Sequence, residues 1–350
     1  MFILNDIINV VVKMDFILLE DNELQDIFDI VNDFQIIFHP YYFKEGKFEH
    51  YKEFLEDKNN KIIILDRNMT SMIFDYFSKG KLNSEIDMIM ILFFLLFCNI
   101  NSLQYNIGLS ICEYADFKEN GIAINQLNKT LTYLSEIPTM VLKNKLMTGN
   151  YEFKLIDIPN RFHRHANYKR KSDLYMSSYC STLKIAEVYL SDLSIKDKIL
   201  TYLDWYYDHL QLSKYDITYA ILLFTNYKTI KAPKNIKSKN YEKIIKGCKN
   251  QAWDIQYLSS LDNIQYNFEE EYFFATNDNN LKLIFMACNY FEYAWVDLIK
   301  DRISKKDRNE IFNFLEKKSK GRIKPKCGQE ILTKLSIKLE EKIKKKVMIC

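Results

Sequence analysis

Two short runs of consecutive apolar residues stand out from the mixed pattern of the chain, and an aspartate follows each of them. The first run is Lys61–Leu65, followed directly by Asp66, and the second is Tyr272–Ala275, followed closely by Asp278. Unbroken runs rich in β-branched or aromatic residues are typical of strands that are covered on both faces, as in a parallel sheet. We therefore predict two strands of one such sheet, each with a carboxylate beyond its carboxyl end.

Most of the remaining pattern is helical, because apolar residues recur at a spacing of three or four positions. Only 8 glycines and 5 prolines interrupt the chain, which also favours long helices. The most apolar stretch, residues 88–98, is shorter than the roughly 20 residues that a membrane-spanning helix needs, so we expect a buried helix there. Further helices are expected over residues 71–79, 84–98, 102–116, 253–261 and 281–299, and two short N-terminal strands over 15–19 and 34–38.

A chain of 350 residues exceeds the usual size of one domain, so either a large insertion or two fused domains is expected. We predict an α/β domain that is interrupted by a mainly helical insertion. The predicted parts are an N-terminal extension (1–60), the first part of the α/β domain (61–120), the insertion (121–249), the second part of the domain (250–300) and a lysine-rich helical tail (301–350).

The distribution of charge and cysteine gives only limited information about partners and cellular compartment. The net charge of +3 is a small difference between 49 basic and 46 acidic residues, but eight lysines gather in residues 227–249 and twelve lysines or arginines in 317–346. Such segments fit either contact with phosphates or solvated helix faces. Seven scattered cysteines form no CxxC pair, which indicates reduced thiols in a cytoplasm. No basic residue precedes the apolar N-terminal run, so we expect neither a signal peptide nor a membrane anchor.

The positions of Asp66 and Asp278 have two interpretations. In open α/β sheets the functional crevice lies beyond the carboxyl ends of the parallel strands, which is where both carboxylates are predicted to lie. A helix also follows each strand, and an aspartate at that point is a common N-cap. Each aspartate alone is therefore weak evidence for a functional site. Two aspartates at neighbouring strand ends favour the interpretation as a functional site.

Three segments of the chain resemble the PIN-domain family of nucleases. These are Ile62-Ile-Ile-Leu-Asp66-Arg67-Asn68, Ala252-Trp-Asp254-Ile-Gln, and Ala275-Thr-Asn-Asp278. The family's middle acidic position is matched best by Glu113, and Arg67 departs from the pattern because many relatives have a hydroxyl residue there. The resemblance implies a three-layer α/β/α PIN-like domain with a central, mostly parallel sheet, here carrying a large helical insertion.

The resemblance also implies a site that holds Mg²⁺ or Mn²⁺ through carboxylates. Hard divalent cations prefer oxygen ligands, and a bound ion can activate water and stabilise the charge that develops on a phosphodiester. Clustered carboxylates repel one another unless a cation neutralises them. The implied metal ligands and catalytic residues are Asp66, Glu113, Asp254 and Asp278, with Asn68 and Thr276 orienting the ligands or the water.

The expected activity is hydrolysis of RNA by an endonuclease, with a toxin or defence role and an inhibitory or regulatory protein as partner. A DNA nuclease and a non-catalytic PIN-like protein that binds nucleic acid or protein remain as alternatives. The basic segment that contains Arg161, Arg164, Lys169 and Arg170, together with Arg67, is a candidate nucleic-acid contact. His163 and His165 lack companion ligands for zinc, and no glycine-rich phosphate-binding loop is present.

Overall fold

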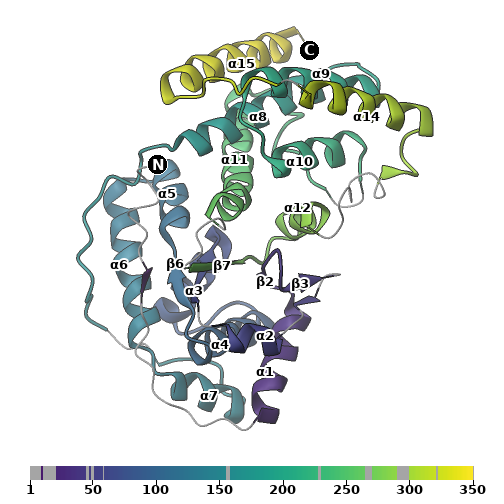
Figure 1. Cartoon of the computed structure of the whole chain (residues 1–350). Coiled ribbons are helices and arrows are strands. Elements are labelled where there is room, and N and C mark those ends of the chain that lie inside the picture. Colours follow the sequence, from purple (N-terminus) through teal and green to yellow (C-terminus); the bar gives the residue numbers. More distant parts are fainter. Residues whose placement is uncertain are drawn as a thin grey trace. The chain divides into compact units, whose positions relative to one another are not determined.

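The structure is a computed structural model of the whole chain (Figure 1). It describes residues 9–10, 21–44, 47–48, 51–57, 59–154, 158–227, 230–264, 270–289, 299–320 and 322–349. Contacts divide the chain into two compact units, and each unit contains two separate stretches of sequence. Residues 1–170 and 263–278 form what we call the sheet unit, and residues 171–262 and 279–350 form the helical unit.

A five-stranded sheet lies at the centre of the sheet unit, with the strand order β1-β6-β5-β7-β2. The three inner strands are parallel, whereas the two edge strands run antiparallel to their neighbours. Leu65 of β5 pairs with Ala275 of β7, so these two strands end level with each other. The strands are β1 (Asn9–Val10), β2 (Ile37–Phe38), β5 (Asn60–Leu65), β6 (Gln104–Asn106) and β7 (Glu270–Ala275), and β3 (Phe43–Lys44) pairs with β4 (Lys47–Phe48) in a separate hairpin.

Two groups of helices accompany this sheet: α1, α4 and α7 pack together, and so do α3, α5 and α6. Ile62–Leu65 are all buried, which is why the apolar run of β5 shows no alternation. Aromatic rings tie the first group to the sheet, because Phe54 stacks on Phe97 at 6.0 Å and meets Phe273 edge-on at 5.4 Å. The helices are α1 (Asp21–Phe34), α2 (Tyr51–Glu56), α3 (Arg67–Lys79), α4 (Glu85–Ile100), α5 (Gly108–Phe117), α6 (Asn120–Glu136) and α7 (Thr139–Thr148).

In the helical unit, α8 contacts α9, α10 and α15, and α10 also contacts α9 and α12. Tyr175 and Trp253 pack with ring centroids 4.4 Å apart, so α8 and α11 share this core. The helices are α8 (Asp173–Tyr189), α9 (Ile195–His209), α10 (Lys214–Phe224), α11 (Tyr241–Ile264), α12 (Asn279–Asn289), α14 (Lys305–Ser319) and α15 (Gln329–Ile349).

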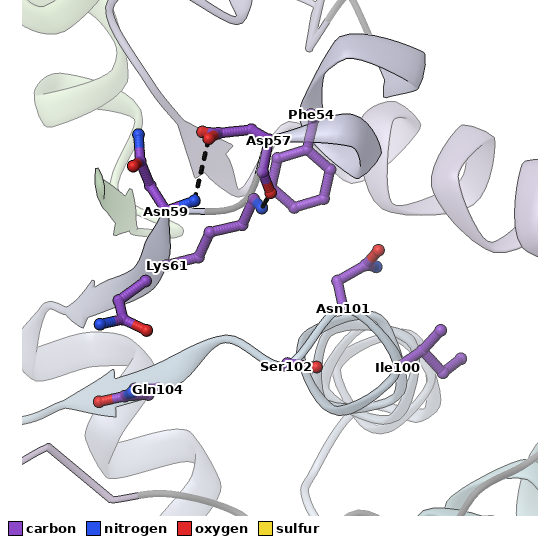
Figure 2. Close-up of a pocket in the computed structure, with 9 residues that line it drawn as sticks. Phe54, Asp57, Asn59, Lys61, Ile100, Asn101, Ser102 and Gln104 are labelled. Carbon is purple, nitrogen blue, oxygen red and sulfur yellow. Dashed lines mark hydrogen bonds between the residues drawn. The ribbon is translucent and has the colours of Figure 1, made fainter. Parts of the chain in front are cut away.

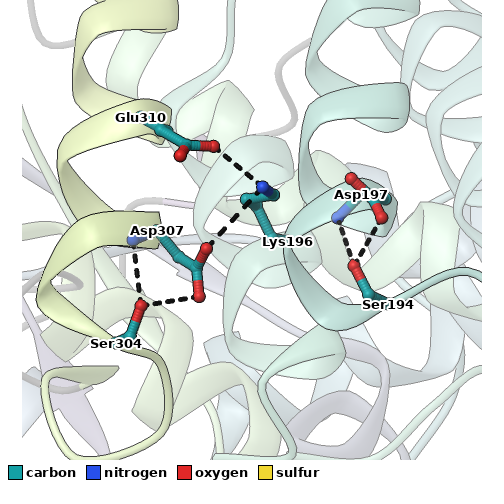
Figure 3. A network of polar contacts seen from close by, with 6 residues as sticks. All are labelled: Ser194, Lys196, Asp197, Ser304, Asp307 and Glu310. Atoms are coloured by element: carbon teal, nitrogen blue, oxygen red, sulfur yellow. Dashed lines mark hydrogen bonds and ion pairs between the residues drawn. The ribbon is translucent and has the colours of Figure 1, made fainter.

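Serine side chains begin several of these helices, and an ion pair joins two of the helix starts (Figure 3). Ser194 accepts a hydrogen bond from the Asp197 amide at the start of α9, and Ser304 does the same for Asp307 at the start of α14. The Lys196 ammonium at the start of α9 forms an ion pair with the Glu310 carboxylate of α14, with Nζ and Oε2 2.8 Å apart. Each cap satisfies an amide that has no partner within the helix, so these serines fix where α9 and α14 begin.

The structure confirms a mixed α/β chain with a mostly parallel sheet, and both predicted inner strands form. Residues 102–116 differ from the expected single helix, because Gln104–Asn106 form β6 before α5 begins at Gly108. The predicted strand over 34–38 forms only at its end, since α1 continues to Phe34. The predicted strand over 15–19 and residues 290–298 of the last predicted helix lie outside the described residues.

The boundaries of the two compact units differ from the domain boundaries that we predicted from the sequence. Residues of the expected N-terminal extension supply β1 and β2, which complete both edges of the sheet. Residues 121–170, which were expected in the insertion, belong to the sheet unit because α6 packs on α3 and α5. The apolar stretch around residues 88–98 forms the buried helix α4, and no helix among the described residues is long and apolar enough to cross a membrane.

Candidate active site at the strand ends

Asp66 lies at the carboxyl end of β5 and begins helix α3 as its N-cap. One carboxylate oxygen, Oδ1, accepts a hydrogen bond from the Met69 amide at 2.7 Å, and the Asp66 amide donates to the Ala275 carbonyl at 3.1 Å. The side chain is only 2% exposed. The capping interpretation of Asp66 is therefore confirmed, and its carboxylate is also held at the carboxyl ends of the two central strands.

Thr276 connects Asp66 to the segment that follows β7. Its hydroxyl donates a hydrogen bond to Oδ2 of Asp66 at 2.5 Å and accepts one from the Asp278 amide at 2.9 Å. Thr276 is fully buried, and its own amide donates to the Ile36 carbonyl at 3.0 Å. One hydroxyl thus joins two aspartates whose strands are 210 residues apart in the sequence.

Burial raises the pKa of Asp66 from its ordinary value of 3.8 to about 7. The hydrogen bonds from Met69 and Thr276 act in the opposite direction, because they stabilise the ionised form. The negative charge of Asp278 raises the pKa further, so the two carboxylates interact electrostatically. At neutral pH this carboxyl group is close to its titration point, and a nearby cation would favour loss of its proton.

The other two predicted acids are not joined to this pair by any contact described above. Glu113 lies partly exposed on α5 of the sheet unit. Asp254 lies on α11 in the helical unit, where it accepts a hydrogen bond from Gln251 at 3.3 Å. Among the described residues no group of three or more His, Cys, Asp or Glu side chains is arranged to hold a metal ion. The four-acid site therefore stays a prediction, of which the structure brings together Asp66 and Asp278.

Two carboxylates at the strand ends suit the implied metal. Mg²⁺ keeps several waters and is commonly bound by one or two carboxylates plus substrate phosphates. Asp66 and Asp278 provide two carboxylates, and each oxygen of Asp66 that accepts one hydrogen bond has a second lone pair. The pair therefore fits such an ion with few protein ligands.

The roles predicted for Asn68 and Arg67 stay predictions. The Asn68 side chain is exposed, and its backbone amide is one of the groups that lower the pKa of Asp66. The Arg67 guanidinium lies 3.9 Å from the centre of the Tyr114 ring, where it forms a cation–π contact between α3 and α5. Sequence reasoning missed this contact because no pattern relates the two positions.

The predicted basic segment runs along helix α6. It is held there through its backbone and through an ion pair between the Arg161 guanidinium and the Glu136 carboxylate at 2.7 Å. The Asn128 side chain accepts a hydrogen bond from the Arg164 amide at 3.0 Å, and Thr132 accepts one from the Arg161 amide at 3.2 Å. Asn120 accepts a further bond from the Tyr168 amide at 2.9 Å. The side chains that face solvent are Arg161, His163, Arg164, His165, Lys169 and Arg170. The segment is thus an anchored, exposed basic strip.

A second polar cluster, which sequence reasoning missed, lies at the amino ends of the same strands. His39 is buried, and its Nδ1 accepts hydrogen bonds from the amides of Tyr41 and Tyr42. Its Nε2 lies 3.6 Å from Glu271 at the start of β7. Burial lowers the pKa of His39 to about 3 and raises the pKa of Glu271 to about 8. The sequence offers no periodic signal for this pair, because Glu271 lies among the polar residues at the start of an otherwise apolar strand.

Comparison of the chain with protein-family models, with curated proteins and with solved structures yields no match. The class that the fold defines is therefore a mixed α/β protein with a mostly parallel sheet. The resemblance to PIN-domain nucleases stays a prediction that rests on the three short segments described above.

Proposed function

We propose that the sheet unit is a three-layer PIN-like nuclease domain that hydrolyses phosphodiester bonds, most favourably in RNA, with Mg²⁺ or Mn²⁺. One observation carries the proposal: the carboxyl ends of two adjacent parallel strands bring Asp66 and Asp278 together through the Thr276 hydroxyl. The role of helix N-cap alone explains why an aspartate stands at position 66. It does not explain why a second acid, Asp278, is coupled to Asp66 through a buried threonine.

In this proposal the chain's own residues position the reaction. Asp66 and Asp278 would hold the cation, and Thr276 fixes the orientation of the Asp66 carboxylate through its hydroxyl. When bound, such an ion polarises the phosphodiester and lowers the pKa of an attacking water. Asp66 must release its proton to act as a ligand, and burial raises its pKa, so we expect metal-dependent cleavage to weaken as the pH falls.

The basic strip supports a nucleic-acid substrate. Arg161, Arg164, Lys169 and Arg170 are exposed on the same unit as the strand-end acids, and their backbone is anchored to α6. Cations held on a rigid element bind a polyphosphate with a smaller loss of conformational entropy than a free loop would. RNA is the substrate that the family resemblance favours, and DNA is the alternative. A toxin or defence nuclease of this kind would also need an inhibitory partner.

The decisive experiment incubates end-labelled single-stranded RNA and DNA with the full chain, in Mn²⁺ or in EDTA. We expect cleavage that needs the metal and falls at least about 100-fold in Asp66→Asn and Asp278→Asn. Asp75→Asn is the matched control, because Asp75 is an acid on the surface of the same helix α3, where it pairs with Lys79. Thr276→Val should reduce cleavage by about 10- to 100-fold, because it removes only the orienting hydroxyl.

Cleavage of neither polymer by the wild-type chain would overturn the proposal, and so would undiminished cleavage in both aspartate variants. A second candidate function is non-catalytic binding of nucleic acid. The observation that favours it is that the Asp66 carboxylate is already engaged by Met69 and Thr276, as a structural cap requires. Retention of RNA without cleavage, lost in a double Arg161→Ala and Arg164→Ala variant, would support this candidate.

A further inference from the structure

A cavity of about 340 Å³ opens in the sheet unit at the amino ends of β5 and β6 (Figure 2). Asn60 and Lys61 begin β5 and Gln104 begins β6, and all three line the cavity. Asp57 and the end of α4 complete the wall. The volume falls in the range of pockets that bind small molecules, roughly 300 to 1,000 Å³.

This cavity is separate from the strand-end acids. It lies where β5 begins, whereas Asp66 follows the last residue of the same strand. A strand rises about 3.3 Å per residue, so the six residues of β5 place the two sites roughly 20 Å apart. Whatever binds in the cavity does not touch Asp66 or Thr276, and its function can be tested separately from the proposed nuclease.

One cation and one anion line the cavity next to each other. The Lys61 ammonium donates to the backbone carbonyl of Asp57 at 2.5 Å and lies 5.0 Å from the centre of the Phe54 ring. It therefore retains further N–H donors for a ligand. The Asp57 carboxylate accepts hydrogen bonds from the Asn59 amide at 3.0 Å and from the Tyr42 hydroxyl.

The neighbouring Glu271 carboxyl group determines the charge on Asp57. The nearby Glu271 carboxyl group is the main cause that holds the pKa of Asp57 below its ordinary value. Burial raises the pKa of Glu271 to about 8, so Glu271 keeps the proton and Asp57 carries the negative charge at neutral pH. Lys61 also lowers the pKa of Asp57. The wall thus presents one fixed positive and one fixed negative charge.

Carboxamides form most of the remaining polar wall, and one of them has an unused acceptor. The Asn101 amide group donates to the Phe97 carbonyl at 2.9 Å, whereas its buried oxygen accepts no hydrogen bond from the described residues. In Figure 2 the Asn101 side chain points away from α4. The other carboxamides of the wall are those of Asn59, Asn60 and Gln104, which can each donate and accept hydrogen bonds.

We propose that this pocket binds a small zwitterion of the α-amino acid class with a polar side chain. The carboxylate of such a ligand complements Lys61, and its ammonium complements Asp57. Its polar side chain can form hydrogen bonds with the carboxamides of the wall. A nucleotide fits less well, because its phosphate would meet a single lysine beside a carboxylate. A neutral sugar would leave both charges of the wall without a counter-charge.

The test measures binding to the full wild-type chain by titration calorimetry, with L-glutamine as the probe. Two analogues each lack one charge: glutaramic acid lacks the ammonium and 4-aminobutanamide lacks the carboxylate. We expect saturable binding of L-glutamine, and an increase in Kd of at least about tenfold for each analogue. Adenosine monophosphate, glucose and L-leucine complete the panel as an anion, a neutral polyol and an apolar zwitterion, and each should bind more weakly.

Variants then assign the charges. Asp57→Asn and Lys61→Met should each weaken L-glutamine binding at least about tenfold. Lys81→Met is the matched control, because Lys81 is an exposed lysine of the same unit that pairs with Glu152. The analogue series uses only wild-type protein, so it decides the question even if a variant does not fold. No binding of any amino acid at millimolar concentration, or tighter binding of the nucleotide or the sugar, would overturn the proposal.

Discussion

Replacing Asp66 by asparagine removes the ionisable group at the carboxyl end of β5 while keeping its size and its acceptor oxygen. The folded chain holds the Asp66 pKa at about 7, against an ordinary value of 3.8, because the side chain is buried. The folded state therefore keeps a proton that the unfolded state releases, and the stability of the wild-type chain falls as the pH rises from about 4 to about 7. Above both values the loss is complete, and the difference between them corresponds to roughly 4 kcal/mol.

The assay is urea unfolding of wild type and Asp66→Asn, followed by far-ultraviolet circular dichroism at about pH 5 and about pH 8. We expect the variant to gain stability over wild type between the two conditions, because asparagine has no charge to bury. Taking the difference between the two chains cancels the titration of every group that they share. Asp75→Asn, on the exposed face of the same helix, should show no such gain.

A difference in stability that is equal at both pH values would refute the assignment of a buried, titrating carboxyl group. The same experiment bears on the proposed metal site. A cation that binds Asp66 stabilises the folded state by mass action, so Mg²⁺ should raise the stability of wild type at about pH 8 and leave Asp66→Asn unchanged. A stabilisation by Mg²⁺ that is identical in both chains would place its binding elsewhere.

Four further substitutions test the packing, a buried acid and a helix cap. Gly247→Ala places a Cβ 1.9 Å from the Lys234 carbonyl oxygen. Urea unfolding should therefore show a free energy of unfolding that is lower by about 1 to 3 kcal/mol. In Gly121→Ala the added Cβ meets no atom within 4 Å, so this control should be neutral or stabilising. Asp216→Asn should make the fall in stability between about pH 4 and about pH 6 smaller, because burial raises the pKa of Asp216 to about 6 and the variant lacks that titration. An unchanged pH profile would contradict this. Ser304→Ala should cost about 1 kcal/mol by thermal or urea unfolding, since it removes the cap at the start of α14.

The central strands could be predicted because both of their faces are covered. Ile62–Leu65 and Tyr272–Ala275 are buried without alternation, and that pattern is visible in the sequence itself. Strand β6 could not be predicted, because Leu103 and Ile107 flank it at a spacing that also suits a helix. The two-residue edge strands carry too few residues for any periodicity, and the sheet pairs them through tertiary contacts alone.

The site was predictable only where the relevant residue adjoins a strong strand. Asp66 and the Thr276–Asp278 segment follow β5 and β7 directly, and the structure joins them. His39 and Glu271 had no comparable signal, because their contact depends on the pairing of β2 with β7. Asp254 matches the family pattern in sequence, yet the contacts assign it to the other unit. Short motifs indicate residue types well, but they do not report which compact unit a residue joins.

The pairing of β5 with β7 also determines when the sheet unit can finish folding. During synthesis β6, one partner of β5, emerges soon after it, but the other partner, β7, arrives only with residues 270–275, after residues 171–262 of the helical unit have been made. Contacts across so long a separation close slowly. Until then an apolar strand edge stays open to pairing with other chains, which favours aggregation. A chain that stops before residue 270 should therefore be insoluble, and chaperones that cover strand edges should be most needed late in translation.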